Sequence, residues 1–220
     1  MDVSTTLVVA AATLLIAATT LAWWLRRRAS FHAALQQRGW HVSTEGDDTV
    51  VVPVTGDWTL TMTRSFASQM SPPSTHIVTS IWTCPTPATL GAVLVAGPAP
   101  PPELRELAAD LIGGAPPWIS RLLGIDRVSG GRPLQPVTGK DDRLLVFASD
   151  GIGPTGTLRP VADALAEWCA VFTAEREQPV LTMDRSGLSV RVRVDVLDSV
   201  ETADAFVNLG LRCRGAVNRS

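Results

Sequence analysis

The chain has 220 residues, and its 19 Lys and Arg residues against 21 Asp and Glu residues give a formal net charge of −2. This balance excludes the strongly basic surface that nucleic-acid-binding domains need. Cys84, Cys169 and Cys213 stand far apart without CxxC spacing, which argues against a zinc knuckle or a disulfide framework and fits a reducing compartment. Basic charge is almost all Arg, with Lys140 the single lysine, a usage typical of GC-rich genomes such as those of actinobacteria.

The N-terminal segment 4–25 contains no ionisable side chain, ends close behind two tryptophans and is followed at once by three arginines. A helix of this length, at about 1.5 Å per residue, covers the roughly 30 Å hydrocarbon layer of a bilayer. Tryptophan favours the headgroup boundary, and basic clusters favour the cytoplasmic flank of a span. We therefore expect a single transmembrane helix in the plasma membrane, with the N-terminus outside and the C-terminal domain in the cytoplasm. The expected membrane-interface residues are Trp23, Trp24, Arg26, Arg27 and Arg28.

Two other interpretations of residues 4–25 remain open, a cleaved secretory signal and a buried core helix. A secretory signal carries positive charge ahead of an apolar core of about 7 to 15 residues. Here Asp2 is the only early charge and the basic cluster comes afterwards, which favours an anchor. The high content of Ala and Thr keeps the signal interpretation open, although threonine hydroxyls can bond to the helix backbone and so permit insertion.

Behind the predicted span, residues 26–39 form a basic juxtamembrane segment, expected to be helical up to Gly39, and residues 40–220 form a single α+β domain. His41 is expected in a loop. Beyond it, β-branched residues and period-two alternation predict four strands, the first two paired as a hairpin around a turn at residues 55–57. Strands in succession favour an antiparallel sheet. The four strands are expected over residues 48–54, 57–65, 76–84 and 90–97.

A Pro-rich connection over residues 97–103 separates the predicted strands from the predicted helices that follow. Apolar residues at helical spacing behind Pro102 predict a helix that reaches residue 112, and a second short helix is expected over residues 116–124. Residues 129–142 are rich in Gly, Pro and charge, and they predict an exposed loop.

The last third has the clearest patterns. Residues 143–149 predict a buried strand, and residues 179–184 with 188–196 predict a hairpin whose second strand alternates strictly between apolar and polar side chains. Asp198 with Glu201 resembles a capping arrangement for a final helix. One apolar stripe predicts another helix of about 15 residues. The members of this stripe are Val161, Leu165, Trp168 and Phe172.

Strands that come in runs predict an α+β fold, with a mainly antiparallel sheet and about three to four helices behind the transmembrane helix. The succession of strand, helix, hairpin and capped helix from Arg143 to Arg212 resembles the C-terminal part of uncharacterised single-pass actinobacterial membrane proteins with a domain of unknown function. This resemblance covers about a third of the chain. It brings no known activity.

Common catalytic and nucleotide-binding motifs are missing: the sequence has no GxxxxGK[ST], no GxGxxG opening a helix and no GxSxG. His76 and Cys84 are the only His/Cys pair close in sequence, and on one strand they would stand about 26 Å apart, too far for a dyad. Asp150, beside a strand end and a Gly-rich turn, is the most site-like acid, although a turn-forming role explains it better. We therefore predict no catalytic, cofactor-binding or metal-binding residue.

Arg191 and Arg193, with Arg185 before the turn, could present a basic ridge to acidic lipid headgroups or to a protein partner, although alternation on a solvated strand explains them without function. The sequence favours a membrane-anchored, non-catalytic interaction or scaffold module. Its expected partners are the lipid bilayer and another membrane or cytosolic protein, and not nucleic acid. A membrane-anchored enzyme with an unidentified site, and an exported envelope protein after signal cleavage, are the alternatives.

Overall fold

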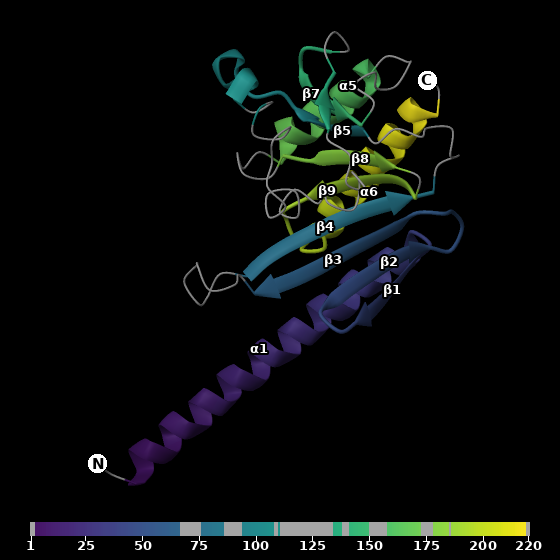
Figure 1. Ribbon diagram of the computed structural model, residues 1–220. Helices are drawn as coiled ribbons and strands as arrows, with labels where there is room; N and C mark the ends of the chain where they lie inside the picture. The colour runs from purple at the N-terminus through teal and green to yellow at the C-terminus, as the bar shows by residue number, and fades with distance from the viewer. Residues whose placement is uncertain are drawn as a thin grey trace.

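The computed structural model describes most of the chain, and the arrangement of its elements is drawn in Figure 1. Within the described helices and strands, side chains are described except those of residues 3–12, 65–66, 76–77 and 94–96. The described residues are 3–66, 76–85, 94–107, 110, 134–137, 141–149, 158–172, 178–184 and 186–218.

The centre of the fold is a nine-stranded sheet with the strand order β1-β2-β3-β4-β9-β8-β5-β7-β6, in which every pair of neighbours is antiparallel. This confirms the predicted α+β class and the antiparallel sheet. The strands are β1 (Trp40–Glu45), β2 (Asp48–Pro53), β3 (Thr59–Phe66), β4 (His76–Cys84), β5 (Leu94–Pro98), β6 (Gln135–Pro136), β7 (Leu144–Ala148), β8 (Val180–Asp184) and β9 (Gly187–Val192). The helical elements are α1 (Val3–Gln37), the 3₁₀ turn η1 (Pro102–Leu104), α5 (Arg159–Val171) and α6 (Val200–Val217).

The first four strands form a meander. The predicted hairpin is confirmed as β2 and β3, which pair with Val51 opposite Leu60 and turn through Gly56 at a φ of 134°. The prediction of a loop at His41 was wrong, because this residue lies in the edge strand β1 and pairs with Val52 of β2. The predicted fourth strand, residues 90–97, is found over its described part as β5, and residues 90–93 lie outside the described residues. Strand β5 leaves the meander and pairs with β7 and β8.

The C-terminal strands complete the sheet from its middle outward. The hairpin β8–β9 is confirmed, and β9 joins it to the meander by pairing with β4. Its second strand is shorter than predicted, since β9 ends at Val192. The predicted loop 129–142 contains the short strand β6, and the helix predicted from Pro102 starts as the turn η1 and continues over residues 105–107. The helix predicted over residues 116–124 lies outside the described residues.

Helices α5 and α6 pack against each other and against one face of the sheet (Figure 1). Three members of the predicted stripe on α5 are buried, and Trp168 stacks on the fourth, Phe172, with ring centroids 4.2 Å apart. Helix α6 lies against the fully buried Trp82 of β4. Its N-cap is Ser199, whose side chain accepts a hydrogen bond from the backbone N–H of Thr202, and so the predicted capping role of Asp198 was wrong by one residue.

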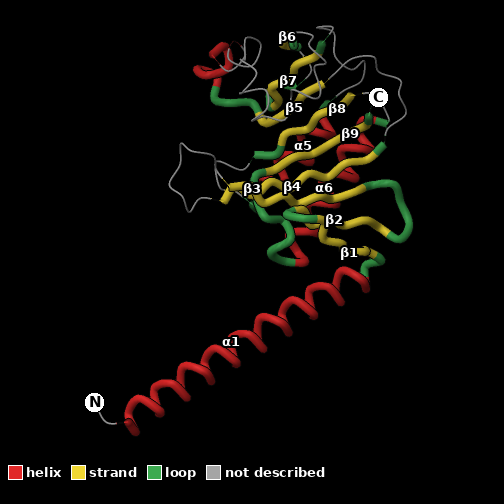
Figure 2. The backbone as a smooth tube through the Cα atoms, turned by 60° about the horizontal axis from the view of Figure 1, so that its bottom comes forward, coloured by secondary structure: helices red, strands yellow, loops and turns green. Residues whose placement is uncertain are grey.

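Helix α1 is continuous and leaves the domain beside β1, so that most of its length projects away from the sheet (Figure 1, Figure 2). Its last turns are fixed to the domain by Leu35, whose side chain is fully buried, and the chain then turns at Gly39 with a φ of 72°. The expected helical segment up to Gly39 is therefore confirmed. Over the residues that the structure describes, no helix is both long enough and apolar enough to cross a membrane.

Candidate functional site: a pocket at the base of helix α1

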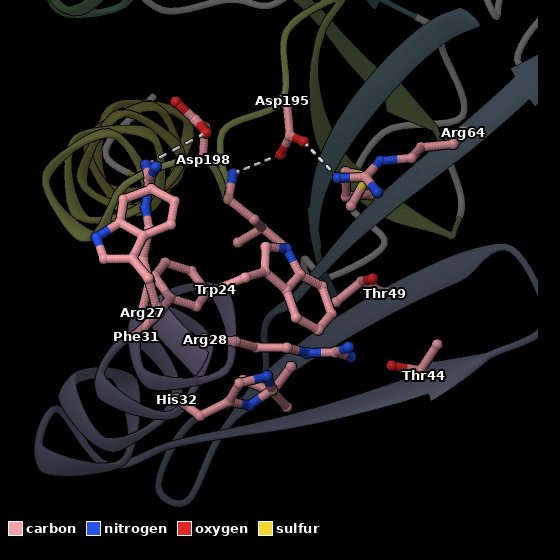
Figure 3. A pocket seen from close by; sticks show the side chains of 14 residues that line it. Trp24, Arg27, Arg28, Phe31, His32, Thr44, Thr49, Arg64, Asp195 and Asp198 are labelled. Carbon is pink, nitrogen blue, oxygen red and sulfur yellow. Dashed lines mark hydrogen bonds and ion pairs between the residues drawn. The ribbon is translucent and has the colours of Figure 1, made fainter. Parts of the chain in front are cut away.

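A pocket of about 380 Å³ opens where α1 leaves the domain. It has three walls, formed by one side of α1, by the nearby face of strands β1 to β3, and by the segment between β9 and α6 (Figure 3). These walls come from three separate parts of the sequence. The pocket is therefore a product of the tertiary fold.

The α1 wall contains two tryptophan–arginine pairs at a spacing of four residues, which places the members of each pair on one helix face. The Cζ atom of Arg27 lies 5.6 Å from the ring centroid of Trp23, and that of Arg28 lies 5.4 Å from the ring centroid of Trp24. Both distances suit a cation–π contact. Four of the five predicted membrane-interface residues thus meet in this wall, whereas Arg26 is exposed and does not line the pocket.

The sheet wall is formed by side chains on the face that also carries the core. Thr44 and Thr49 are directly opposite each other on β1 and β2, and Thr49 is in turn opposite the buried Met62 of β3. Neither threonine hydroxyl bonds to another residue in the described part of the chain. The wall therefore presents two hydroxyl groups with free hydrogen-bonding capacity to the pocket.

The third wall is held in place by side-chain hydrogen bonds. Asp195 accepts a bond of 2.8 Å from Nη2 of Arg64 and another of 3.0 Å from the backbone N–H of Leu197 (Figure 3). Asp198 lies 3.9 Å from Nη2 of Arg27, and both of these side chains are more than half exposed. The first ion pair is well formed, and the second is long and solvated, which makes its contribution to stability small.

The charges in the pocket do not cancel. Three arginines, Arg27, Arg28 and Arg64, face two carboxylates, Asp195 and Asp198. Among the described residues no carboxylate pairs with Arg28, whose guanidinium reaches across the pocket to the side of the two threonines (Figure 3). The pocket therefore has an excess of positive charge, centred on Arg28.

The residues considered for catalysis are described only in part, and the described ones are not brought together. His76 and Cys84 are the two ends of β4, as the strand prediction required, and Asp150 lies outside the described residues. Burial raises the pKa of the Cys84 thiol to about 11 and that of the Cys213 thiol to about 12, so that both stay protonated near neutral pH. Among the described residues there is also no group of three His, Cys, Asp or Glu side chains able to hold a metal ion.

The predicted basic ridge is described only in part. Arg191 is half-buried in β9, Arg193 is exposed just beyond the end of that strand, and Arg185 lies outside the described residues. Neither Arg191 nor Arg193 lines the pocket.

Comparison of the chain with protein-family models, with curated proteins and with solved structures gives no match.

Proposed function

We propose that this protein is a membrane-anchored, non-catalytic interaction module. In this proposal, α1 spans the bilayer over residues 4–25, and the α+β domain lies on the cytoplasmic side of the plasma membrane. There it binds another membrane or cytosolic protein.

One observation carries the proposal: over residues 13–25, the projecting part of α1 whose side chains are described, the helix is uncharged and its large apolar side chains have no protein cover. Leu14, Leu15 and Ile16 are 72%, 68% and 63% exposed. Three successive positions on a helix point about 100° apart, so these side chains cannot all face one partner groove. Burying each of them is worth about 1.5 to 3 kcal/mol, and a bilayer covers all of them at once.

The polar groups of this part of α1 are satisfied within the helix. The hydroxyl of Thr19 donates to the backbone oxygens of Leu15 and Ile16, and that of Thr20 to those of Ile16 and Ala17, all at 2.9 Å. A hydroxyl that bonds to its own helix carries little penalty in hydrocarbon. The threonines are therefore compatible with insertion, as the sequence predicted.

The order of residues along α1 supports the depth and direction of insertion. The stretch from Ser4 to Leu25 is uncharged. The described helices contain no segment long and apolar enough to cross a membrane, and the side chains of residues 3–12, the first part of the proposed span, lie outside that description. At about 1.5 Å per residue, the stretch from Ser4 to Leu25 matches the hydrocarbon thickness. The tryptophans and Arg26 to Arg28 follow it on the domain side, which under the positive-inside bias favours a cytoplasmic domain.

Topology is the decisive test, and the structure supplies its design. A reporter cysteine replaces the exposed Asn218, and the half-buried Cys169 is changed to serine, while the protonated Cys84 and Cys213 remain as unreactive residues. A matched control carries its reporter at position 2, on the other side of the proposed span. Intact and permeabilised cells are then treated with a membrane-impermeant maleimide.

We expect the Asn218→Cys reporter to be labelled only after permeabilisation and the Asp2→Cys reporter to be labelled in intact cells. Alkaline carbonate should leave the full chain in the membrane fraction and release a chain that lacks residues 1–28. Labelling of Asn218→Cys in intact cells would show that the domain lies on the opposite side of the membrane from the one proposed. Release of the full chain by carbonate would overturn the anchor itself.

A further inference from the structure

We infer that the pocket at the base of α1 binds the phosphate headgroup of an anionic glycerophospholipid from the leaflet that borders the domain. This inference rests on the proposed membrane anchoring of α1. It goes beyond that proposal because anchoring needs only a nonspecific bilayer, whereas the pocket would select one class of lipid.

The position of the pocket fits a headgroup. Trp23 and Trp24 line it and remain 61% and 49% exposed, and directly before them α1 carries the exposed Leu21. Tryptophan rings favour the boundary between headgroups and hydrocarbon. With α1 inserted up to Leu25, the pocket therefore opens at the level of the lipid phosphates, and acyl chains can lie along α1 beside Leu21.

The chemistry of the pocket fits a phosphate. The guanidinium of Arg28 lies over the ring of Trp24 and has no carboxylate partner among the described residues. A guanidinium can donate two parallel hydrogen bonds to phosphate oxygens. The hydroxyls of Thr44 and Thr49 lie in the same pocket and can donate to the remaining oxygens.

The acidic wall limits what the pocket accepts. Asp195 is already paired with Arg64, so this arginine is neutralised and positioned, and the unpaired cation is Arg28. One uncompensated arginine matches the single negative charge of a phosphate diester. A volume of about 380 Å³ lies at the small end of the roughly 300 to 1,000 Å³ typical of small-molecule sites. This suits a polar headgroup whose acyl chains stay outside.

Native mass spectrometry of the full chain in a non-ionic detergent tests the inference directly. The protein is mixed with equal amounts of phosphatidylglycerol and phosphatidylcholine, and the ratio of the two lipid adducts is measured. The variant is Arg28→Gln. The matched control is Arg26→Gln, which removes the same charge from the same arginine cluster at a residue outside the pocket.

We expect the wild type and Arg26→Gln to retain phosphatidylglycerol in preference to phosphatidylcholine. In Arg28→Gln the ratio of the two adducts should fall about tenfold, as is typical of the loss of one charge-assisted contact. Thr49→Val, which removes a pocket hydroxyl with little change in shape, should lower the preference without changing net charge. Equal effects of the Arg26 and Arg28 variants would mean that the lipid preference comes from the net positive charge of the cluster and not from the pocket, and would overturn the inference. A wild type without preference would also overturn it.

A second arm separates a lipid from a free phosphate compound. Glycerol 3-phosphate at millimolar concentration is added to the protein–lipid complex, and we expect the phosphatidylglycerol adduct to persist because the acyl chains contribute to binding. Displacement by glycerol 3-phosphate would assign the site to a soluble phosphate ester and overturn the lipid assignment.

The failure of this inference is distinguishable from a failure of the anchor. Flotation of the full chain with vesicles of pure phosphatidylcholine reports anchoring without any anionic headgroup, and Arg28→Gln should float as the wild type does. A chain that floats but shows no lipid preference refutes the pocket alone. A chain that does not float refutes the anchor on which the pocket depends.

Discussion

The contact between Gly210 of α6 and Trp82 of β4 gives the sharpest prediction about stability. A Cβ atom added at Gly210 would lie 2.5 Å from Cε3 and 2.6 Å from Cε2 of the Trp82 ring, and closer still to Cδ2. Carbon atoms in van der Waals contact are about 3.5 to 4.0 Å apart. The substitution Gly210→Ala therefore forces α6 and the sheet apart by about 1 Å, or forces a rigid and fully buried ring to move.

The magnitude follows from two opposing effects. Overpacking of a tight core costs about 1 to 3 kcal/mol, and a rigid ring places this contact at the upper end of that range. Alanine in a helix interior gains about 1 kcal/mol over glycine. The net loss in the free energy of unfolding is then about 2 kcal/mol, which in a domain of this size lowers Tm by about 4 to 8 °C.

The assay is thermal unfolding of the full chain in detergent micelles, followed by near-UV circular dichroism of its tryptophans. Gly97→Ala is the matched control, because its added Cβ would lie 3.7 Å from the nearest heavy atom, the carbonyl oxygen of Pro179. This substitution should leave Tm unchanged or raise it slightly, since glycine weakens a strand relative to alanine. A Tm for Gly210→Ala equal to that of the control would refute the packing argument.

The double variant Trp82→Phe/Gly210→Ala tests the cause. The smaller ring makes space for the alanine methyl, so the two substitutions together should cost at least about 1 kcal/mol less than the sum of their separate effects. Strict additivity would mean that Gly210 is needed for a reason other than this ring.

Three further predictions concern the cap, the thiols and a buried hydroxyl. Ser199→Ala should lower the free energy of unfolding by about 1 kcal/mol, because it leaves an N-terminal amide of α6 uncapped, whereas Asp198→Ala should change Tm little. Equal effects of the two substitutions would contradict the cap assignment. With pKa values raised to about 11 and 12, Cys84 and Cys213 are at most about one part in a thousand thiolate at pH 8, and maleimide should modify them only after unfolding; rapid labelling of the native protein would refute their burial. Ser80→Ala should lower the free energy of unfolding by about 1 to 3 kcal/mol, because it leaves the backbone oxygen of Val194 and the backbone N–H of Val196 without this hydrogen-bond partner. It should also weaken the lipid preference of the pocket. An unchanged Tm would show that another group replaces the hydroxyl.

Local sequence patterns predicted the elements in which the spacing of apolar residues alone determines which side chains are buried. The stripe on α5 and the alternation in β3 each bury one face, and both appear where the sequence placed them. Strand β1 was missed because its residues are mixed in character, and pairing with β2 is what makes it a strand. The local sequence of such an edge strand contains little of that information.

The early end of β9 shows how a distant side chain changes a local pattern. Alternation continues in the sequence to Val196, but the hydroxyl of Ser80 donates to the backbone oxygen of Val194 and accepts from the backbone N–H of Val196. A side chain more than 110 positions away thereby takes the place of strand partners. The chain bends there and positions Ser199 at the N-cap of α6.

The same limit applies to the candidate site. Four residues of its α1 wall were singled out from the order of uncharged, aromatic and basic residues, a local signal, but as membrane-interface residues and not as parts of a pocket. The pairing of Arg64 with Asp195 joins residues 131 positions apart and could not be derived from spacing. Thr44 lies in β1 and was missed together with that strand. Thr49 lies in the predicted strand β2, but its place in the pocket depends on where α1 packs.

Two buried side chains anchor the walls of the pocket to the core. Leu35 fixes the end of α1 to the domain, and Ser80 fixes the segment that carries Asp195. From Trp24 to Leu35 an uninterrupted helix rises about 17 Å, so a domain held at Leu35 cannot move far from the level of the tryptophans. Because both walls are set by the core, Arg28 is positioned before any lipid arrives, and little ordering remains to oppose binding. Loosening either anchor should therefore reduce the lipid selectivity proposed for the pocket while leaving the proposed membrane insertion of α1 intact.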